Sequence, residues 1–411
     1  MTASATKTEQ GSDLDTFRTE VRAWLDANFP TALQGVLPMM EGGADGKHSA
    51  DMANWRDRLA ERGWGTPHWP KPYGGAGLDH AQVRALAQEM GRAGAINPIP
   101  LLAGMGVTMV GPTILEYGSE AQKQKHLPGI ASGKVRWCLG LSEPNAGSDL
   151  ASLGTLAEDR GDHFVVNGQK TWTSGADISQ WCGALVRTDK TVAKHKGISF
   201  LMLPMDQPGV RTRPIRLISG ASPFCETFFD DARAEKGDLL GELNDGWNVI
   251  KRLLQHERAS QTSAGSSGGK QKARGLHEIA KHYVGVDEQG RLGDLDLRAR
   301  LTRHLMDAQA HKLTAERIAA EAKGNPEVSA AASIMKNSAT GITQARSELT
   351  LEIMGQQGFG WEGDAYDAEE LFTVRDWLWG KAISIYGGSA EVQKNIISKN
   401  ILGLPETTQK G

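Results

Sequence analysis

Residues 137–149 read Trp-Cys-Leu-Gly-Leu-Ser-Glu-Pro-Asn-Ala-Gly-Ser-Asp, and residues 167–174 read Asn-Gly-Gln-Lys-Thr-Trp-Thr-Ser. The first stretch gathers hydroxyl groups and a Gly-Ser pair, with glycine where a backbone must approach a ligand closely. In the second, an Asn-Gly pair between residues of strand character predicts a hairpin turn. That hairpin would present Trp172 and Ser174 on the same face of a strand. Together the two stretches suit a planar, hydrogen-bonding cofactor.

Length and composition bound the class of protein. At 411 residues the chain exceeds the size at which one hydrophobic core keeps growing, so we expect two or three domains. A net charge of −3, without a basic block, argues against nucleic acid or a membrane as the main partner. Cys138, Cys182 and Cys225 form no Cys-x-x-Cys pair, which indicates neither a disulfide framework nor a metal site. Residues 1–10 lack the apolar core of a secretory signal, so we expect a cytoplasmic protein.

The hydrophobic period changes twice along the chain. Apolar residues first recur at helical spacing, as in residues 13–28, where Ser12 or Asp13 is the predicted cap. Short strand-like runs between turns follow and suggest a small β-barrel or sandwich. Long helices then return, and they suffice for an antiparallel four-helix bundle. These last helices are predicted over residues 245–260, 294–323, 326–354 and 367–399. The predicted domains are an N-terminal α-helical domain at 1–133, a central β-barrel at 134–243 and a C-terminal four-helix bundle at 244–411.

The two opening stretches resemble the flavin-binding signatures of the acyl-CoA dehydrogenase family, and the likeness runs from about residue 17 to residue 405. Residues 72–77, Pro-Tyr-Gly-Gly-Ala-Gly, resemble the family's loop before its third helix. Residues 385–393, Ile-Tyr-Gly-Gly-Ser-Ala-Glu-Val-Gln, resemble its C-terminal signature. The resemblance implies FAD-dependent α,β-dehydrogenation of an acyl-CoA thioester to a trans-2-enoyl-CoA. In that reaction a carboxylate removes the α-proton and the β-hydrogen leaves as hydride to the flavin.

The resemblance also assigns residues to the cofactor. Ser142 would hydrogen-bond the ring edge and Ser148 would touch pyrophosphate or substrate. Trp172 would pack against the isoalloxazine, and Ser174 would donate towards its reducible nitrogen. The alternative is that both serines only cap turns and Trp172 is a core aromatic. The other residues that the resemblance places at FAD are Leu139, Leu141, Gly147, Thr173, Glu352, Gly355, Gln356, Ser389 and Glu391.

Two flavin features depart from the family pattern. Many members carry an Arg-x-x-Phe element that reaches across a dimer to the phosphates, and residues 261–283 contain no such element. The family's Gln-x-x-Gly-Gly turn is replaced at residues 352–356 by Glu-Ile-Met-Gly-Gln. A carboxylate at Glu352 is a poor partner for pyrophosphate, because like charges repel.

The catalytic base differs from the commonest family pattern as well. Many members place a glutamate directly after Ile-Tyr, where this chain has Gly387, whose backbone N–H would still polarise the thioester carbonyl. Another branch of the family carries its base just before an arginine on the first bundle helix. That motif is His256-Glu257-Arg258 here, so Glu257 is the predicted base and Glu391 the next candidate. His256 is expected to be an orienting or solvated neighbour, because no second ligand accompanies it at metal spacing. Expected substrate contacts are Ser148, Gln255, Arg258 and Gly388.

Substrate and partners follow from the resemblance alone. Residues 219–226 and the Gly/Ser-rich connector at 265–269 resemble a bacterial subgroup that acts on bulky acyl-CoA esters, including steroid side-chain, branched and cyclic acids. The expected electron acceptor is an electron-transfer flavoprotein. The expected assembly is a homo-oligomer, or a heteromer with a related chain. The alternatives are a flavin oxidase or monooxygenase on the same fold, and a non-catalytic subunit of a heteromeric dehydrogenase.

Overall fold

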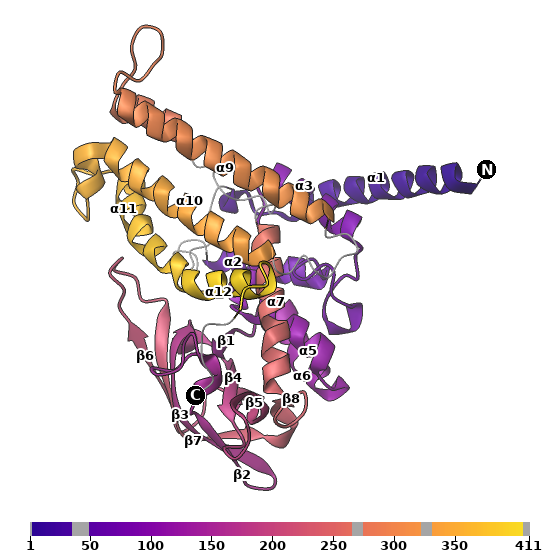
Figure 1. The fold of residues 1–411 in the computed structure, drawn as a ribbon. Coiled ribbons are helices and arrows are strands. Elements are labelled where there is room, and N and C mark those ends of the chain that lie inside the picture. Colours follow the sequence, from indigo (N-terminus) through magenta and orange to yellow (C-terminus); the bar gives the residue numbers. More distant parts are fainter. Residues whose placement is uncertain (1, 35–48, 265–273, 322–330, 406–411) are drawn as a thin grey trace. The chain divides into compact units, whose positions relative to one another are not determined.

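The computed structural model describes residues 2–34, 49–264, 274–321 and 331–405 (Figure 1). The chain divides into two compact units, Met1–Arg216 with Ser222–Lys270, and Leu217–Ala221 with Gln271–Gly411. Helices come first, strands follow and helices return, which confirms the predicted α–β–α order. The domain boundaries at residues 133 and 243 stay a prediction. Within the described ranges, no helix is both long and apolar enough to cross a membrane.

Helices make up the first unit before its sheet. The first helix begins at Thr2, so the predicted cap at Ser12 or Asp13 is wrong. Serine and aspartate cost only a few tenths of a kcal/mol inside a helix, and the helix continues through them. Asp79 and Ser119 each start a later helix with a capping box. The helices are α1 (Thr2–Asn28), α2 (Ser49–Glu61), α3 (His80–Arg92), α4 (Ile99–Leu102), α5 (Gly111–Tyr117) and α6 (Glu120–Ala131).

Eight strands form one mixed sheet, in the order β6-β7-β3-β2-β4-β5-β8, with β1 parallel to β4 off this path. Within the described residues β6 and β8 end the sheet, so the closed barrel predicted from the sequence is wrong. Strand β8 has only two residues, and β6 contains Pro214, which cannot donate a ladder hydrogen bond. The strands are β1 (Trp137–Gly140), β2 (Leu156–Asp159), β3 (His163–Ser174), β4 (Trp181–Arg187), β5 (Ile198–Pro204), β6 (Val210–Ile215), β7 (Phe224–Glu235) and β8 (Leu239–Leu240).

Strand β3 is continuous where the sequence predicts a hairpin. Asn167 and Gly168 lie inside it, at a bulge where the register against β7 shifts. Gly168 has φ +152°, and a Cβ there would lie 2.6 Å from the Thr155 hydroxyl, so the bulge requires glycine. The Asn167 amide donates to Asp231 (2.9 Å) and its oxygen accepts from the Asp231 N–H (2.8 Å). The hairpin prediction is wrong because bulges and turns favour the same residue types.

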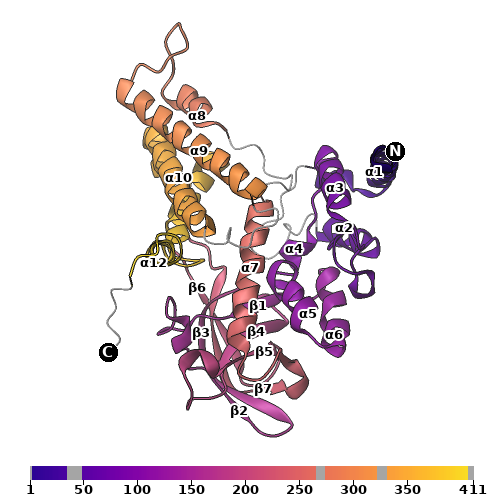
Figure 2. The same ribbon diagram turned by 45° about the vertical axis from the view of Figure 1, so that its right-hand side comes forward.

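Helix α7 (Gly246–Ala264) completes the first unit (Figure 2). The helix predicted over residues 245–260 is confirmed, with its end a few residues later. The sequence predicts it as the first helix of a C-terminal bundle, and its contacts within the first unit are with β5, α5 and the helical turn Gly106–Val110. Val249, Ile250 and Leu253 are buried in these contacts.

The second unit is helical, and α10 packs against each of the other four helices in it. Its core contains Leu276, Leu297, Leu349 and Ile353. The single helix predicted over residues 367–399 is two helices, because Gly387 and Gly388 between them adopt φ +65° and +83°. The connector at 265–269 lies outside the described residues. The helices are α8 (Leu276–Tyr283), α9 (Leu295–Glu321), α10 (Ala331–Met354), α11 (Ala368–Gly380) and α12 (Ala390–Asn400).

Candidate active site

The 141–149 loop, residues 141–149, follows β1 and carries the predicted flavin contacts. A hydrogen bond from the Thr171 N–H to the Ser142 carbonyl (2.9 Å) ties it to β3. Lys170, one residue earlier on β3, is fully buried. Its ammonium group donates to the Leu141 carbonyl (3.1 Å) and to Glu143 Oε1 (2.8 Å). Strand β3 therefore holds the first half of the loop through both backbone and side chain.

Glu143 holds the same loop from its other side. Its carboxylate accepts the backbone N–H groups of Gly154 (2.6 Å) and Thr155 (2.9 Å), which lead into β2. Burial alone would raise the pKa of Glu143, but the Lys170 ammonium and these two N–H groups outweigh burial and lower its pKa. This pairing indicates a structural role for Glu143. The carboxylate is ionised at neutral pH and joins three segments of the chain.

The far end of the 141–149 loop is open. Gly147 and Ser148 are exposed, and among the described residues no heavy atom lies within 4 Å of where a Gly147 Cβ would be. Leu139 is buried in the core, whereas Leu141 and Ser142 are partly exposed. The fixed half of the loop thus presents Leu141 and Ser142, and the open half offers backbone and a hydroxyl to a ligand.

Trp172 combines a left-handed backbone conformation with an exposed side chain. It has φ +60°, at a second register shift of β3 against β7, and its side chain is 55% exposed. A left-handed conformation is unfavourable for a bulky side chain and usually marks a functional constraint. The indole contacts Phe224 edge to face, with ring centroids 5.9 Å apart. The bulge turns Trp172 outwards, Thr173 is fully buried, and Ser174 is partly exposed.

Glu257 lies on the buried stripe of α7. Helical residues three, four or seven apart share a face, so Glu257 continues the stripe of Ile250 and Leu253. Its side chain is partly buried. The sequence alone left open that this is a solvated surface carboxylate, and the position on the apolar stripe argues against that alternative.

A polar cluster next to the stripe fixes how α7 is rotated. Arg252 donates two hydrogen bonds to Glu116 of α5, at 2.6 and 2.7 Å, and a third to Gln255 (2.8 Å). His256 Nε2 lies 3.3 Å from Glu116 Oε1, and burial lowers the pKa of His256, so its imidazole is neutral at pH 7. Gln255 is exposed, and the side chain of Arg258 lies outside the described residues. His256 lies beside this cluster, and its role as an orienting neighbour of Glu257 stays a prediction.

In the second unit, two side chains hold the turn at Gly387 and Gly388 by donating hydrogen bonds to its carbonyls. Gln393 donates to the Gly387 carbonyl (2.9 Å), and Lys336 of α10 donates to the Gly388 carbonyl (2.8 Å). Ser389 then caps α12 by accepting the Val392 N–H (3.3 Å). Glu391, in the first turn of α12, is exposed. The turn is fixed, and the position of Gly387 carries no side chain that could accept a proton.

Glu352 has a cationic partner in the second unit. Arg300 of α9 donates to both of its carboxylate oxygens, to Oε1 at 2.6 Å, and these bonds lower the pKa of Glu352. Gly355 and Gln356 follow at the end of α10, where both are exposed and Gly355 has φ +58°. The repulsion that the sequence predicts between Glu352 and a pyrophosphate is therefore offset by Arg300.

The groups of the first unit fit a flavin. A flat, exposed indole is held in a strained backbone beside the partly exposed hydroxyl of Ser174. The Thr173 hydroxyl is buried and has no hydrogen-bond partner among the described residues. An aromatic face with neighbouring neutral hydrogen-bonding groups matches a planar ring that carries its own polar edge.

Comparison with known proteins agrees with this geometry. Models of the N-terminal, middle and C-terminal domains of acyl-CoA dehydrogenases match residues 12–134, 138–232 and 244–402. The acyl-CoA dehydrogenase IpdE1 of Mycobacterium tuberculosis is 37% identical over 96% of this chain and 98% of its own length. The chain belongs to the acyl-CoA dehydrogenase family. It is therefore an FAD-dependent enzyme that dehydrogenates acyl-CoA thioesters.

Solved structures of other acyl-CoA dehydrogenases share the whole fold. The Tcur3481-Tcur3483 steroid ACAD superposes with a TM-score of 0.73 at 30% identity, covering 96% of this chain and 98% of that one. The ChsE4-ChsE5 complex of Mycobacterium tuberculosis superposes with a TM-score of 0.70 at 28% identity, covering 96% and 98%.

Three cations that hold predicted site residues could not be identified from the sequence. Lys170, Arg300 and Lys336 hold predicted site residues, yet each appears in the sequence as an ordinary solvated cation. The burial of Lys170 could not be found from the sequence either, because a regular strand places Lys170 and Trp172 on one face and only the bulge separates them. A lysine on the inward face of a strand needs a buried partner. No spacing rule relates Arg300 to Glu352 or Lys336 to Gly388.

Proposed function

We propose that Glu257 is the base that removes the α-proton of the acyl-CoA thioester. The position of Glu257 on the apolar stripe of α7 carries this proposal, because Gly387 offers no carboxylate at the family's other base position. Partial burial reduces the hydration of the carboxylate, which makes it a stronger base towards the α-proton. When bound, FAD accepts the β-hydrogen together with its electron pair.

The remaining residues position the reaction. The hydrogen bonds between Arg252 and Glu116 fix the rotation of α7, so that Glu257 is presented in one orientation. Gln393 and Lys336 hold the carbonyls of the Gly387 turn, which leaves its N–H groups to polarise a thioester carbonyl. Leu139, Leu141, Ser142, Gly147, Ser148, Trp172, Thr173 and Ser174 form the flavin-binding set of the first unit, and Glu352, Gly355, Gln356, Ser389 and Glu391 that of the second.

The base is tested with Glu257→Gln, which keeps the shape but cannot accept the proton. We expect flavin reduction by a good substrate to slow by about a hundred- to ten-thousand-fold. Bound FAD should stay at the wild-type level. Glu242→Gln, an exposed glutamate before α7, is the matched control and should react like wild type. Reduction of E257Q at the wild-type rate would place the base elsewhere, and Glu391→Gln would be tested next.

We propose a bulky acyl chain, of the steroid, branched or cyclic type, as the substrate class. The support is the similarity to an enzyme described as a steroid ACAD, together with the small residues Ala259, Ser260 and Ala264 after the base. Anaerobic bleaching of the flavin by a panel of acyl-CoA thioesters tests this. Faster bleaching by straight-chain than by polycyclic thioesters would contradict it.

We propose an obligate dimer or larger assembly, with a related chain as the second subunit. The lack of an Arg-x-x-Phe element in residues 261–283 and the similarity to the two-chain ChsE4-ChsE5 complex support this. Large exposed side chains of the second unit, Phe359, Phe372 and Ile385, suit a covered interface. A flavin-loaded, active monomer in sedimentation would contradict it.

We propose an electron-transfer flavoprotein as the electron acceptor. The substrate-reduced enzyme should pass its electrons to purified electron-transfer flavoprotein faster than to dissolved oxygen. Rapid reoxidation by air with formation of peroxide would instead identify a flavin oxidase. We also propose domain boundaries at residues 133 and 243 and a cytoplasmic location for the protein.

A further inference from the structure

Three charged side chains lie within or beside the 141–149 loop, shielded from most of the solvent, and none of them has a role in the proposed reaction. Lys170 and Glu143 form the ion pair described above, at 2.8 Å. Arg187, at the end of β4, is also buried and donates to the carbonyls of Ala151 (2.6 Å) and Leu153 (3.3 Å). Two cations and one carboxylate leave one excess positive charge. We call Lys170, Glu143 and Arg187 the buried triad.

The neighbouring surface charges do not cancel this excess. Lys194 and Asp149 pair with one another at 3.0 Å, and both side chains are more than half exposed. Exposed charges are screened by water and salt, whereas buried charges are screened much less. The triad therefore adds a fixed positive potential to the segment that carries Ser142 and Ser148.

Lys170 also links the two flavin-binding segments. Its ammonium group holds the Leu141 carbonyl, directly before Ser142. Its backbone lies at the start of the register shift that turns Trp172 outwards. A displaced Lys170 side chain would thus disturb the loop and the strained indole together.

We propose that the buried triad, acting through Lys170 as a positioning residue, sets both the affinity of the protein for FAD and the midpoint potential of the bound flavin. This rests on the proposed placement of the flavin against Ser142 and Trp172. Reduction by two electrons with uptake of one proton adds one negative charge to a flavin. A buried positive excess therefore stabilises the reduced form more than the oxidised form, and it attracts the pyrophosphate in both.

The test compares four variants with wild type, by FAD titration of the apoprotein and by redox titration against reference dyes at pH 8. Lys170→Met should raise the Kd for FAD by about tenfold or more, because a charge-assisted anchor is lost. It should also lower the midpoint potential, since one positive charge disappears. A tenfold change in the relative affinity for the two redox forms corresponds to about 30 mV for a two-electron couple.

The net charge of the buried triad allows a second test, which uses the midpoint potential. Lys170→Met with Glu143→Gln removes one charge of each sign, so the excess and the midpoint potential should return to wild type. Arg187→Met removes a cation without breaking the Lys170–Glu143 pair and should lower the potential, which keeps the proposal testable if K170M does not fold. A purely structural role would leave the potentials unchanged, or make the double variant at least as different from wild type as K170M.

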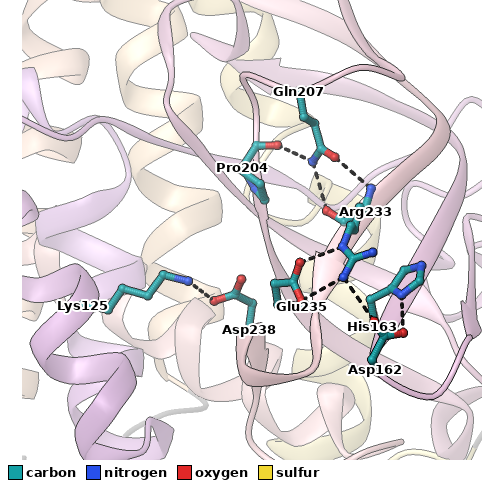
Figure 3. Close-up of polar contacts among 8 residues, drawn as sticks. All are labelled: Lys125, Asp162, His163, Pro204, Gln207, Arg233, Glu235 and Asp238. Atoms are coloured by element: carbon teal, nitrogen blue, oxygen red, sulfur yellow. Dashed lines mark hydrogen bonds and ion pairs between the residues drawn. The ribbon is translucent and has the colours of Figure 1, made fainter.

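Asp238 supplies the matched control. Figure 3 shows Lys125 bonded to this carboxylate, at 2.7 Å, apart from the Arg233 network formed with Gln207, Glu235 and Asp162. Asp238 is buried in the same unit, so Asp238→Asn should lower thermal stability without moving the flavin potential. If wild type takes up FAD but K170M and R187M keep its Kd and potential, the triad proposal is overturned and the proposed function stands. If wild type takes up no FAD, the proposed function itself fails.

Discussion

Two regions of the molecule carry predicted flavin residues, and each contains a glutamate paired with a cation. In the first unit the pair is Glu143 with Lys170, and both side chains are shielded from water. In the second unit the pair is Glu352 with Arg300, and both side chains are more than a third exposed. The same chemistry therefore has two purposes. The buried pair fixes a loop whose geometry must not vary, whereas the exposed pair adjusts the charge of a surface.

The largest expected effect is on the buried pair. Lys170→Met leaves Glu143 buried without its cation, and breaking such a pair destabilises a protein by about 3–5 kcal/mol. Denaturant unfolding of the apoprotein measures this loss. Lys194→Met removes an exposed lysine of the same region and should change stability by less than about 1 kcal/mol. Equal losses in the two variants would mean that burial makes no difference here.

Acid should reveal the same contrast. The pKa of Glu143 is lower in the folded protein than its unfolded value of about 4.3, so the carboxylate contributes stability above that pH and loses it as pH falls. Wild type should therefore lose unfolding free energy below about pH 4.3 more steeply than E143Q. Parallel pH profiles of the two proteins would contradict the assignment.

Substitutions of Trp172 test whether its left-handed backbone is strained and whether its indole binds FAD. Trp172→Gly and Trp172→Ala both lack the indole, but only glycine tolerates φ +60° without penalty. W172G should exceed W172A in unfolding free energy by about 1 kcal/mol. Both should bind FAD more weakly than wild type. Equal stability of the two variants would show that the left-handed backbone relaxes once the indole is removed.

The smallest effect is expected at the exposed pair. Glu352→Gln should change the unfolding free energy by less than about 1 kcal/mol, because solvent screens the partners. The remaining difference should vanish at about 1 M salt, where the screening length falls to about 3 Å. A salt-independent loss of stability would mean that a partner subunit shields Glu352. The pair Glu352–Arg300 would then be shielded from water like the pair Glu143–Lys170.

The order of the elements was predictable, because the hydrophobic period depends only on neighbours along the chain. The ends of elements were less so. Ser12 and Asp13 have the right chemistry for a helix start, yet the helix passes through them. Asn167 and Gly168 form a bulge instead of a turn, since β7 pairs with the strand on both sides of them. Long-range pairing, which no local pattern encodes, decided both the bulge and the open sheet.

The candidate site divides in the same way. Ser142, Trp172 and Glu257 stand in compact motifs, so the sequence could name them. Their supporting residues could not be named, because Lys170 reaches Glu143 across two segments and Arg300 lies on a different helix from Glu352. The partial burial of Glu257 follows from its place on the stripe of α7, and the sequence alone does not show which face of that helix is packed.

The open sheet has a consequence for how copies of this protein meet in solution. Strand β6 ends the sheet, and a terminal strand with free backbone groups tends to recruit a strand from another molecule. Pro214 removes one donor from β6, and the exposed Arg211 would bring like charges together if two such strands met side by side. The sheet can therefore stay open at β6 without inviting the strand-to-strand aggregation that a closed barrel avoids by having no edge.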